Sequence, residues 1–520
     1  MERFASFFGI FVLLGIGYLC STDRKRVPWR LVATALALQL LLAAFLVKER
    51  WVPGLLWVLC GGSAVALAAD SFRRIHENAG WIARTVGTLS AITAFLCFAI
   101  QMPWIWGWIV GVGGLAGLFT VRLLAPKERP NILRACAIAG SVGVLVLLQA
   151  KWLPTTFAFV ALAGIGDAVM WLVGFAKDGA DFVFGGLREA GGGFVFAIDV
   201  GAIILLFSAL MSVLYYIRFL PWLVGLMAQV LHKALGVSGA ESLSAAANVF
   251  AGQTEAPLVV RPYLARMTKS ETMALMTGGF ATIAGSVLGA YVAILQRGGL
   301  ERGAADLIAA SVMSAPAAFV FAKLFVPETE TPETIHGAAM PRLYVGRNLL
   351  DALAGGVTAG LRLAVNVVAM LLVFYALIKL INASVDWAVF EIFGAKGVTF
   401  QRIYACLFAP FAFLMGVTWD DCVLVGELIG TKTIFNEFIA YERLGEMIEG
   451  RVLSTRSAVL STYALCGFAN FMSIGIQIGG LSPLAPDKRP MFAGLALRAM
   501  IGGALACQLT ACIVGVIGDF

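Results

Sequence analysis

Long apolar segments broken by polar residues are the feature that most restricts how this chain can fold. Hydrophobic residues make up 60% of its 520 residues and charged residues 13%, whereas roughly a quarter of the residues in soluble proteins are charged. A helix needs roughly 20 mostly apolar residues to cross a bilayer, so the chain can hold about 12 spans and no separate soluble domain. The sequence therefore predicts an all-α integral membrane protein.

The distribution of charge and cysteine narrows the function. The net charge of +7 comes from lysines and arginines in short loops, which is typical of orientation signals rather than of nucleic-acid binding. The cluster Arg24-Lys25-Arg26 follows the first apolar segment, the reverse of the order in a cleaved signal peptide. The nine cysteines show no paired metal spacing, so we predict no metal cofactor. We expect a retained first span with the N-terminus outside, in a plasma membrane that we take to be a bacterial inner membrane.

Two polar interruptions occur inside apolar segments. The first comprises Asn248 and Gln253-Thr254-Glu255-Ala256-Pro257, followed by Gly279-Phe280-Ala281-Thr282. The second comprises Asn436-Glu437, followed by Gly467-Phe468-Ala469-Asn470. A carboxylate or a broken helix at membrane depth is costly unless it faces protein, water or a ligand. Two such interruptions in corresponding halves indicate a helical transporter whose repeats meet near the middle of the membrane.

This pattern suggests how the chain is organised. We predict two spans in residues 1–50, about four further spans in 51–154, interfacial helices and a scaffold span in 155–240, and scaffold spans in 301–400. The transport domain would combine 241–300 and 401–485, and a last span would lie in 486–520. We expect re-entrant hairpins at 241–264 and 403–439 and interrupted helices at 272–295 and 458–481. The hairpins enter from opposite sides on this count, so the repeats are inverted.

The interruptions carry groups suited to an ion and a polar substrate. Broken helices expose carbonyls that can coordinate a cation, and half-helix N-termini can donate to a substrate. Neutral oxygens suited to sodium come from Asn248, Thr282 and the carbonyls of Ala251 and Ile283. Donors and acceptors for the edge of a planar heterocycle, with an apolar wall, come from Gln253, Thr254, Glu255 and Val287. Groups suited to a sugar come from Glu437, Phe468, Asn470 and Ser473.

Simpler interpretations remain for several of these residues. Asn470 and Ser473 equally suit bonds between helices, and Thr282 alone more often makes an intrahelical bond. Asp199 more often reaches interfacial water than serves as a proton relay. The adjacent acids Asp420 and Asp421 fit a solvated turn better than a catalytic or metal-binding pair, which leaves a membrane-embedded enzyme as the least favoured alternative.

The strings from Asn248 to Pro257, Gly279 to Gly285, Asn436 to Tyr441 and Cys466 to Asn470 resemble the concentrative nucleoside transporter family. The likeness covers the first two spans and about residue 155 to the C-terminus, whereas 54–153 has no counterpart in the compact bacterial members. The resemblance implies a homotrimer in the lipid bilayer. Each protomer would concentrate nucleosides in the cell by an elevator-type alternating-access mechanism, coupled to Na⁺ or, as the nearest alternative, to H⁺.

The resemblance also implies roles for individual residues. Those matching Gln253, Thr254, Glu255 and Val287 address the nucleobase. Those matching Glu437, Phe468, Asn470 and Ser473 hold the ribose, and those matching Asn248, Ala251, Thr282 and Ile283 bind sodium. The form Gln253-Thr254-Glu255 resembles sodium-coupled members more than proton-coupled ones. Met472, beside the ribose residues, departs from the family pattern and could alter selectivity.

Overall fold

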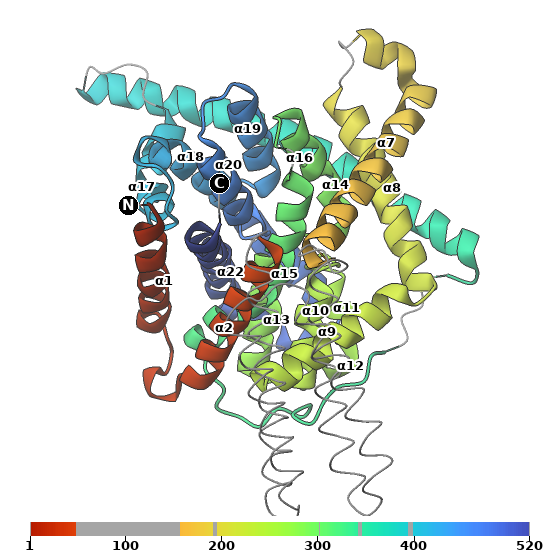
Figure 1. Cartoon of the computed structure of the whole chain (residues 1–520), viewed down its shortest axis with the longest axis vertical. Coiled ribbons are helices and arrows are strands. Elements are labelled where there is room, and N and C mark those ends of the chain that lie inside the picture. The colour runs from red at the N-terminus through yellow and green to blue at the C-terminus, as the bar shows by residue number, and fades with distance from the viewer. Residues whose placement is uncertain are drawn as a thin grey trace, which may run out of the picture. The chain divides into compact units, whose positions relative to one another are not determined.

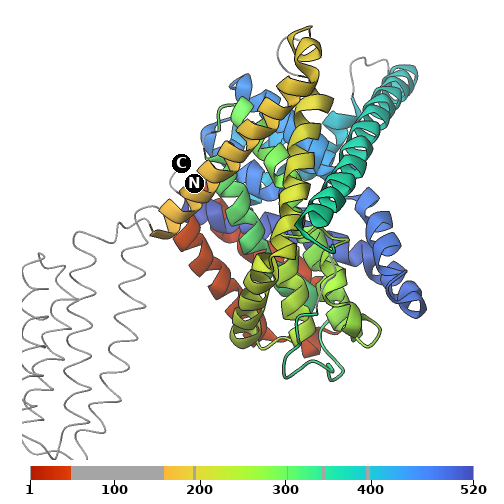
Figure 2. The same ribbon diagram turned by 90° about the vertical axis from the view of Figure 1, so that its right-hand side faces the viewer.

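A computed structural model describes residues 2–47, 157–190, 195–300, 302–341, 346–393 and 399–518. The chain divides into two compact units, one formed by Met1–Ala43 with Leu162–Phe520 and the other by Ala44–Ala161. The first unit contains both polar interruptions (Figures 1 and 2). The four spans predicted in 51–154 lie outside the described residues.

The described part of the chain is helical and contains no strand. Six of its helical segments are long and apolar enough to cross a membrane, and they are Glu2–Leu19, Phe196–Tyr216, Lys269–Arg297, Gly303–Phe325, Leu349–Ile392 and Pro486–Ile517. The prediction of an all-α membrane protein is therefore confirmed.

Long, largely unbroken helices surround the two interruptions. They are α1 (Glu2–Leu19), α2 (Trp29–Leu46), α7 (Phe157–Ala190), α8 (Phe196–Tyr216), α15 (Gly303–Phe325), α16 (Leu349–Phe393) and α22 (Arg489–Ile517). Helices α8 and α16 pack side by side (Figure 2). The other face of α16 exposes large apolar side chains such as Leu350 and Tyr375. Because an exposed apolar face is stable only against lipid or another protein surface, this face of α16 belongs to the perimeter of the unit.

The first interruption is built from short helices. They are α9 (Phe219–Leu235), α10 (Gly239–Asn248), α11 (Ala256–Val259), α12 (Arg261–Leu264), α13 (Lys269–Ala281) and α14 (Gly285–Arg297). Helix α10 begins with a capping box of Ser238 and Glu241, and α13 with one of Thr268 and Glu271. The chain leaves helical geometry after Asn248 and again between α13 and α14. Both breaks fall within the segments predicted as a hairpin and an interrupted helix.

The second interruption has a corresponding order of helices. They are α17 (Phe400–Leu414), α18 (Cys422–Ile434), α19 (Glu437–Glu449), α20 (Thr455–Leu465) and α21 (Phe471–Leu481), with the single helix α19 in place of α11 and α12. Helix α17 packs on α18 as α9 packs on α10, and α18 packs on α20 as α10 packs on α13. The helix pair that corresponds to α10 and α11 is therefore α18 and α19, which meet at Phe435 and Asn436.

This correspondence corrects the predicted second hairpin at 403–439. Gly416, with φ of 80°, does make a turn after α17. Gly426 and Gly430 instead lie inside α18, where a Cβ at Gly426 would come within 2.4 Å of the carbonyl oxygen of Ala405 in α17. These glycines allow two helices to pack closely. The charged segment 441–456, predicted as a connection, is mostly helix α19, because its apolar residues Tyr441 and Leu444 are buried.

Two other predicted boundaries are wrong. The helix expected at 155–177 continues beyond Lys177 to a kink at Phe184, whose backbone angles are not helical, and a second helical part of α7 then runs to Ala190. The long helix expected to end near 381 continues as α16 to Phe393. Neither difference affects the interruptions.

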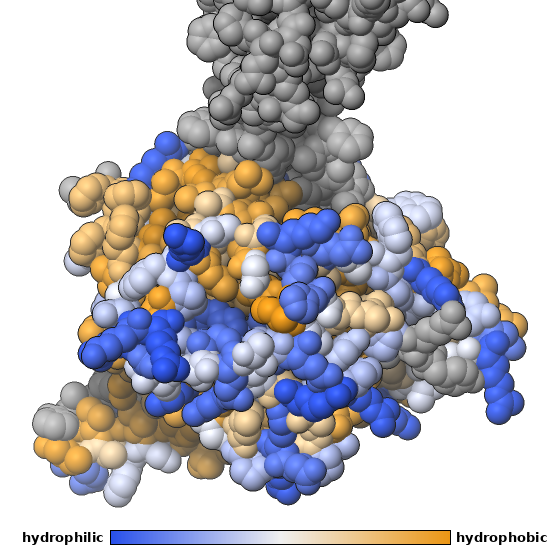
Figure 3. Space-filling view, turned by 90° about the horizontal axis from the view of Figure 1, so that it is seen from below, coloured by the Kyte–Doolittle hydropathy of each residue, from blue (hydrophilic) through white to orange (hydrophobic). Residues whose placement is uncertain are grey.

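The end of the unit at the bottom of Figure 1 has a polar surface. Figure 3 views this end and shows hydrophilic residues gathered across its middle, with hydrophobic residues toward the sides. The loop that follows α15 crosses this end, where the Gly239 amide donates to the Thr334 carbonyl at 2.8 Å and the Tyr263 hydroxyl to the Ala339 carbonyl at 3.1 Å. The loop thereby covers the N-terminus of α10.

Candidate functional site

The first repeat comprises α9–α14 and the second α17–α21, and the breaks of the two repeats lie against each other. Within the first repeat, the amide of Gly285 donates to the carbonyl of Phe250 at 2.8 Å and joins the break after α10 to the break between α13 and α14. Between repeats, Gly467 adopts φ of 140°, and a Cβ there would lie 2.6 Å from the carbonyl oxygen of Phe280. Since only glycine permits this approach, the sequence Gly467-Phe468 brings the second break onto the end of α13.

A chain of hydrogen bonds crosses from the first repeat to the second. The Gln253 amide Nε2 donates to the Ser473 hydroxyl at 3.1 Å, and the backbone N–H of Ser473 donates to Asn470 Oδ1 at 2.8 Å. Asn470 Nδ2 then donates to Glu437 Oε2 at 2.8 Å. All four side chains are buried. The groups predicted for a heterocycle and those predicted for a sugar are therefore neighbours.

Glu437 is the most firmly held of these groups. It is the first residue of α19, whose N-cap Asn436 accepts from the backbone N–H of Ile439 at 2.9 Å. A helix N-terminus stabilises a nearby carboxylate. The Tyr291 hydroxyl adds a second side-chain donor, 3.0 Å from Glu437 Oε1. Tyr291 is not among the residues predicted from the sequence, although it lies four residues after Val287 and hence on the same face of α14.

Thr254 and Glu255 differ from Gln253 in accessibility. Both side chains are exposed, and Glu255, at the N-cap of α11, accepts a long bond of 3.4 Å from the Gly252 amide. The Oε1 atom of buried Gln253 has no hydrogen-bond partner in the described part of the chain. The unpartnered acceptor of Gln253 and the exposed side chains of Thr254 and Glu255 are therefore available to form hydrogen bonds with a ligand.

Apolar and partly apolar residues border this group. Val287 is buried in the first turn of α14, while Phe468 and Met472 are half-buried at the break between α20 and α21. A further residue that the sequence analysis missed is Gln477, whose Nε2 donates to the carbonyl of Met276 at 3.0 Å. Gln477 follows Ser473 by one helical turn, so the spacing of polar residues along α21 was the available signal.

The candidate sodium ligands lie beside the same two breaks. Asn248 ends α10 and is buried, and its Oδ1 has no partner among the described residues. Thr282 donates its hydroxyl proton to the Gly278 carbonyl at 3.0 Å, as the simpler interpretation expected, and its oxygen keeps acceptor capacity. Ala251 and Ile283 are buried. The unpartnered amide oxygen of Asn248, a neutral acceptor beside the two breaks, fits a cation.

Asp199, Asp420 and Asp421 lie apart from the candidate ligands. Asp199 is buried rather than in contact with water, and it accepts from the Val195 amide at 2.8 Å at the start of α8. Asp420 is exposed, as expected for a turn. Asp421 is buried and accepts from Thr418 at 2.7 Å and from the Ser454 hydroxyl at 2.8 Å. Burial would raise the pKa of Asp421, but hydrogen bonds from Thr418, Ser457 and Ser454 outweigh it and lower the pKa.

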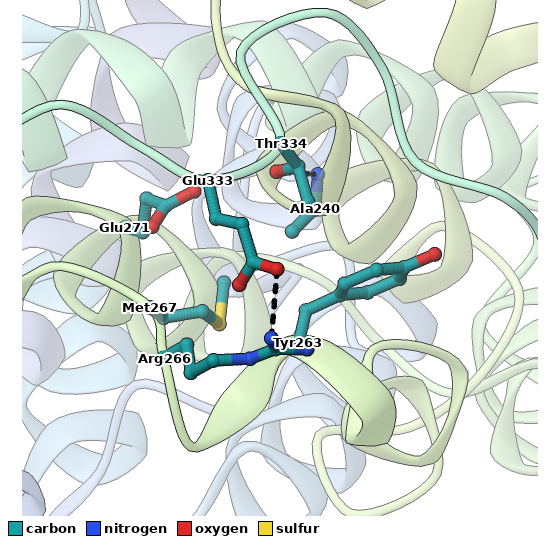
Figure 4. Close-up of a pocket in the computed structure, with 7 residues that line it drawn as sticks. All are labelled: Ala240, Tyr263, Arg266, Met267, Glu271, Glu333 and Thr334. Carbon is teal, nitrogen blue, oxygen red and sulfur yellow. Dashed lines mark hydrogen bonds and ion pairs between the residues drawn. The ribbon is translucent and has the colours of Figure 1, made fainter.

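A small pocket lies at the polar end, away from these breaks (Figure 4). An ion pair of 2.9 Å between Arg266 and Glu333 crosses it. It is lined by Ala240, Tyr263, Arg266, Met267, Glu271, Glu333 and Thr334. None of the predicted site residues lines it, so it is not the candidate substrate site.

Three family models match the chain. They are described as "Na+ dependent nucleoside transporter N-terminus" for residues 8–69, "Nucleoside recognition" for 197–297 and "Na+ dependent nucleoside transporter C-terminus" for 306–515. The first match ends at residue 69, so the likeness reaches further into the block 51–154 than the sequence analysis expected. The second and third include both interruptions.

Curated relatives agree with these models. The rat protein "Sodium/nucleoside cotransporter 1" is 38% identical over 451 residues, which cover 84% of this chain and 68% of that protein. An "Uncharacterized transporter" of Haemophilus influenzae is 41% identical over 413 residues, covering 77% of this chain and 96% of that protein. The mouse "Solute carrier family 28 member 3" is 40% identical, and the matched region spans only 59% of its length.

Solved structures extend the similarity to the fold. "Structure of CNTnw in an inward-facing substrate-bound state" matches with a TM-score of 0.71 and 34% identity, covering 99% of this chain and 98% of that one. An outward-facing CNTnw variant matches with a TM-score of 0.73 and 33% identity over 99% of both chains. The chain belongs to the concentrative nucleoside transporter family, whose members are transporters and not enzymes.

Proposed function

We propose that this chain is a sodium-coupled symporter that concentrates nucleosides in the cell. The observation that carries the proposal is the hydrogen-bonded chain from Gln253 through Ser473 and Asn470 to Glu437. It joins groups from both repeats at a place bordered by half-helix ends. A nucleoside carries the matching chemistry, because it combines a planar heterocycle with a sugar that bears hydroxyls.

We assign one end of the nucleoside to each repeat. The base would lie against Val287 and bond to Gln253, Thr254 and Glu255, since Gln253 has a free acceptor and the other two are open. The ribose hydroxyls would exchange with the bonds now made among Glu437, Asn470 and Ser473, with Phe468 as an apolar wall. Polar groups fix the orientation of a ligand in such a site, and apolar surface supplies much of the affinity.

We assign sodium to Asn248, Ala251, Thr282 and Ile283. Asn248 precedes Gln253 on one break, and Thr282 precedes Val287 on the other, by five residues in each case. An ion that joins these donors would stabilise both breaks in the arrangement that presents Gln253 and Val287 to the base. Sodium would then raise nucleoside affinity, and the nucleoside would raise sodium affinity by the same factor.

We further propose an elevator-type movement within a homotrimer, with the N-terminus outside. The moving part would comprise α10–α14 and α18–α21, whose breaks contact one another. Helix α16 packs mainly on α8 and has an exposed apolar face, which suits a fixed helix in contact with lipid or a second protomer. A plasma membrane, such as a bacterial inner membrane, is the proposed location.

Uptake into vesicles tests the proposal. The purified full-length protein in liposomes should accumulate labelled uridine above equilibrium under an inward sodium gradient. It should not accumulate uridine under a pH gradient alone. Accumulation under a pH gradient would indicate proton coupling instead. The recovered uridine should be chemically unchanged.

Two substitutions test the assigned site in the same assay. Glu255→Gln and Glu437→Gln should each abolish accumulation while the unfolding temperature shows a folded protein. Asp420→Asn changes an exposed acid outside the site and should retain uptake. Normal accumulation in both glutamine variants would contradict the assignment of Glu255 and Glu437 to the substrate site.

A further inference from the structure

The second repeat contains a buried lysine at the place where the first repeat has its candidate sodium ligands. Lys432 lies in the last turn of α18 and is only 2% exposed. Its ammonium donates to the carbonyl of Ala464, in the last turn of α20, at 2.9 Å. Among the described residues no carboxylate forms an ion pair with Lys432, in contrast to the buried Lys323, which pairs with Glu241. The hydrogen bond of Lys432 is therefore made to a carbonyl at a helix end.

Side chains occupy the carbonyls at the end of α20. The Tyr441 hydroxyl donates to the Thr462 carbonyl at 2.9 Å, and the Cys507 thiol donates to the Cys466 carbonyl at 2.7 Å. Lys432 lies within reach of the Cys507 thiol and also attracts Glu437 electrostatically. Because the C-terminus of a helix carries a partial negative charge, the ammonium balances the end of α20 where the chain breaks.

The matching position in the first repeat has no cationic side chain. Residues 239–255 contain no lysine or arginine, and α10 ends at Asn248 with its free Oδ1. Lys432 precedes Glu437 by five residues, and Phe250 precedes Glu255 by five. Lys432 thus aligns between Asn248 and Ala251. Because α18 packs on α20 as α10 packs on α13, the corresponding place in the first repeat lies among the residues proposed to bind sodium.

We propose that Lys432 is a tethered internal cation that performs in the second repeat the structural role of sodium in the first. It holds the end of α20 and the adjoining break, and so positions Glu437 and Asn470 for the ribose without touching the substrate. This inference rests on the proposed sodium symport. It follows that only the first repeat needs an ion from solution, and that a neutral residue at 432 creates a need for a second one.

Uridine binding to the purified full-length protein, measured by calorimetry across a range of sodium concentrations, tests this role. Lys432→Gln should weaken uridine binding by about tenfold or more at low sodium. High sodium should restore the affinity, with a steeper dependence than in the wild type, and choline at equal ionic strength should not. Lys432→Met, which fills similar space without a polar head, should behave like Lys432→Gln.

The charge-preserving variant is the matched control. Lys432→Arg should keep the wild-type sodium curve. An unchanged curve in Lys432→Gln, a loss of affinity that sodium does not restore, or an equal shift in Lys432→Arg would each overturn the inference. If uridine binding to the wild-type protein did not depend on sodium, the proposed function itself would be contradicted.

Discussion

Replacing Tyr291 by phenylalanine tests whether Glu437 must be held in place for nucleoside binding. Tyr291 is fully buried and its hydroxyl donates to Glu437 Oε1 at 3.0 Å. A hydrogen bond to a charged group contributes about 1.5–3 kcal/mol, and Glu437 retains Asn470 as a donor at 2.8 Å. If this contribution is expressed in binding, the uridine Kd should rise by about 10- to 100-fold.

Calorimetric titration of uridine at saturating sodium measures this change. Tyr463→Phe is the matched control, because Tyr463 is also fully buried and donates to a carboxylate, Asp306, at 2.9 Å. That pair joins α20 to α15 and contains no candidate ligand. Tyr463→Phe should lower the unfolding temperature without changing the Kd. An unchanged Kd in Tyr291→Phe, or an equal loss in both variants, would refute the argument that Tyr291 acts through Glu437.

Two further predictions concern the contacts that support the site. Gly467→Ala should destabilise the protein by about 3 kcal/mol or more, because the positive φ and the contact with the Phe280 carbonyl oppose a Cβ; Gly475→Ala, where a Cβ meets nothing within 4 Å, should be neutral in the same thermal unfolding assay. Asp421→Asn should lower the unfolding temperature at pH 7. Because the folded pKa of Asp421 is lowered, its stabilisation is present above about pH 4 and is lost as the pH falls further, so the difference from wild type should vanish in acid. A difference that persists there would contradict the assigned role.

The positions of the breaks could be predicted because their signals are local. Clusters of glycine, hydroxyl, amide and carboxylate residues inside an apolar segment are costly for an unbroken helix that faces lipid. The segment Gly279 to Gly285 carries glycines and a threonine, and the segment Cys466 to Asn470 carries a glycine and an asparagine. In the structure α13 ends within the first segment, and the second segment lies between α20 and α21. The asparagine at 470 even caps α21 by accepting from the Ser473 amide.

The partners of the site residues could not be predicted, because they come from distant segments. Gly430 looks like a turn residue in the sequence, but it serves close packing, since a Cβ would lie 2.3 Å from the ring of Tyr404. Tyr291 is 146 residues from Glu437. The hydropathy of the sequence indicates that such residues are buried, but not which residues they contact. The geometry that unites them depends on how α14, α17 and α18 pack, which the sequence pattern does not specify.

The two repeats share an arrangement of helices but differ in the charge at their breaks, and this difference bears on coupling. An ion held by neutral oxygens such as those of Asn248 and Thr282 can leave when the site opens to a low-sodium solution, whereas the ammonium of Lys432 cannot. On the proposed mechanism, loss of sodium would therefore loosen Gln253 and Val287 while Glu437 and its donors stay in place. The base end of the nucleoside should disengage before the ribose end. The effect of sodium concentration on affinity should therefore differ more between nucleosides that differ in the base than between those that differ in the sugar.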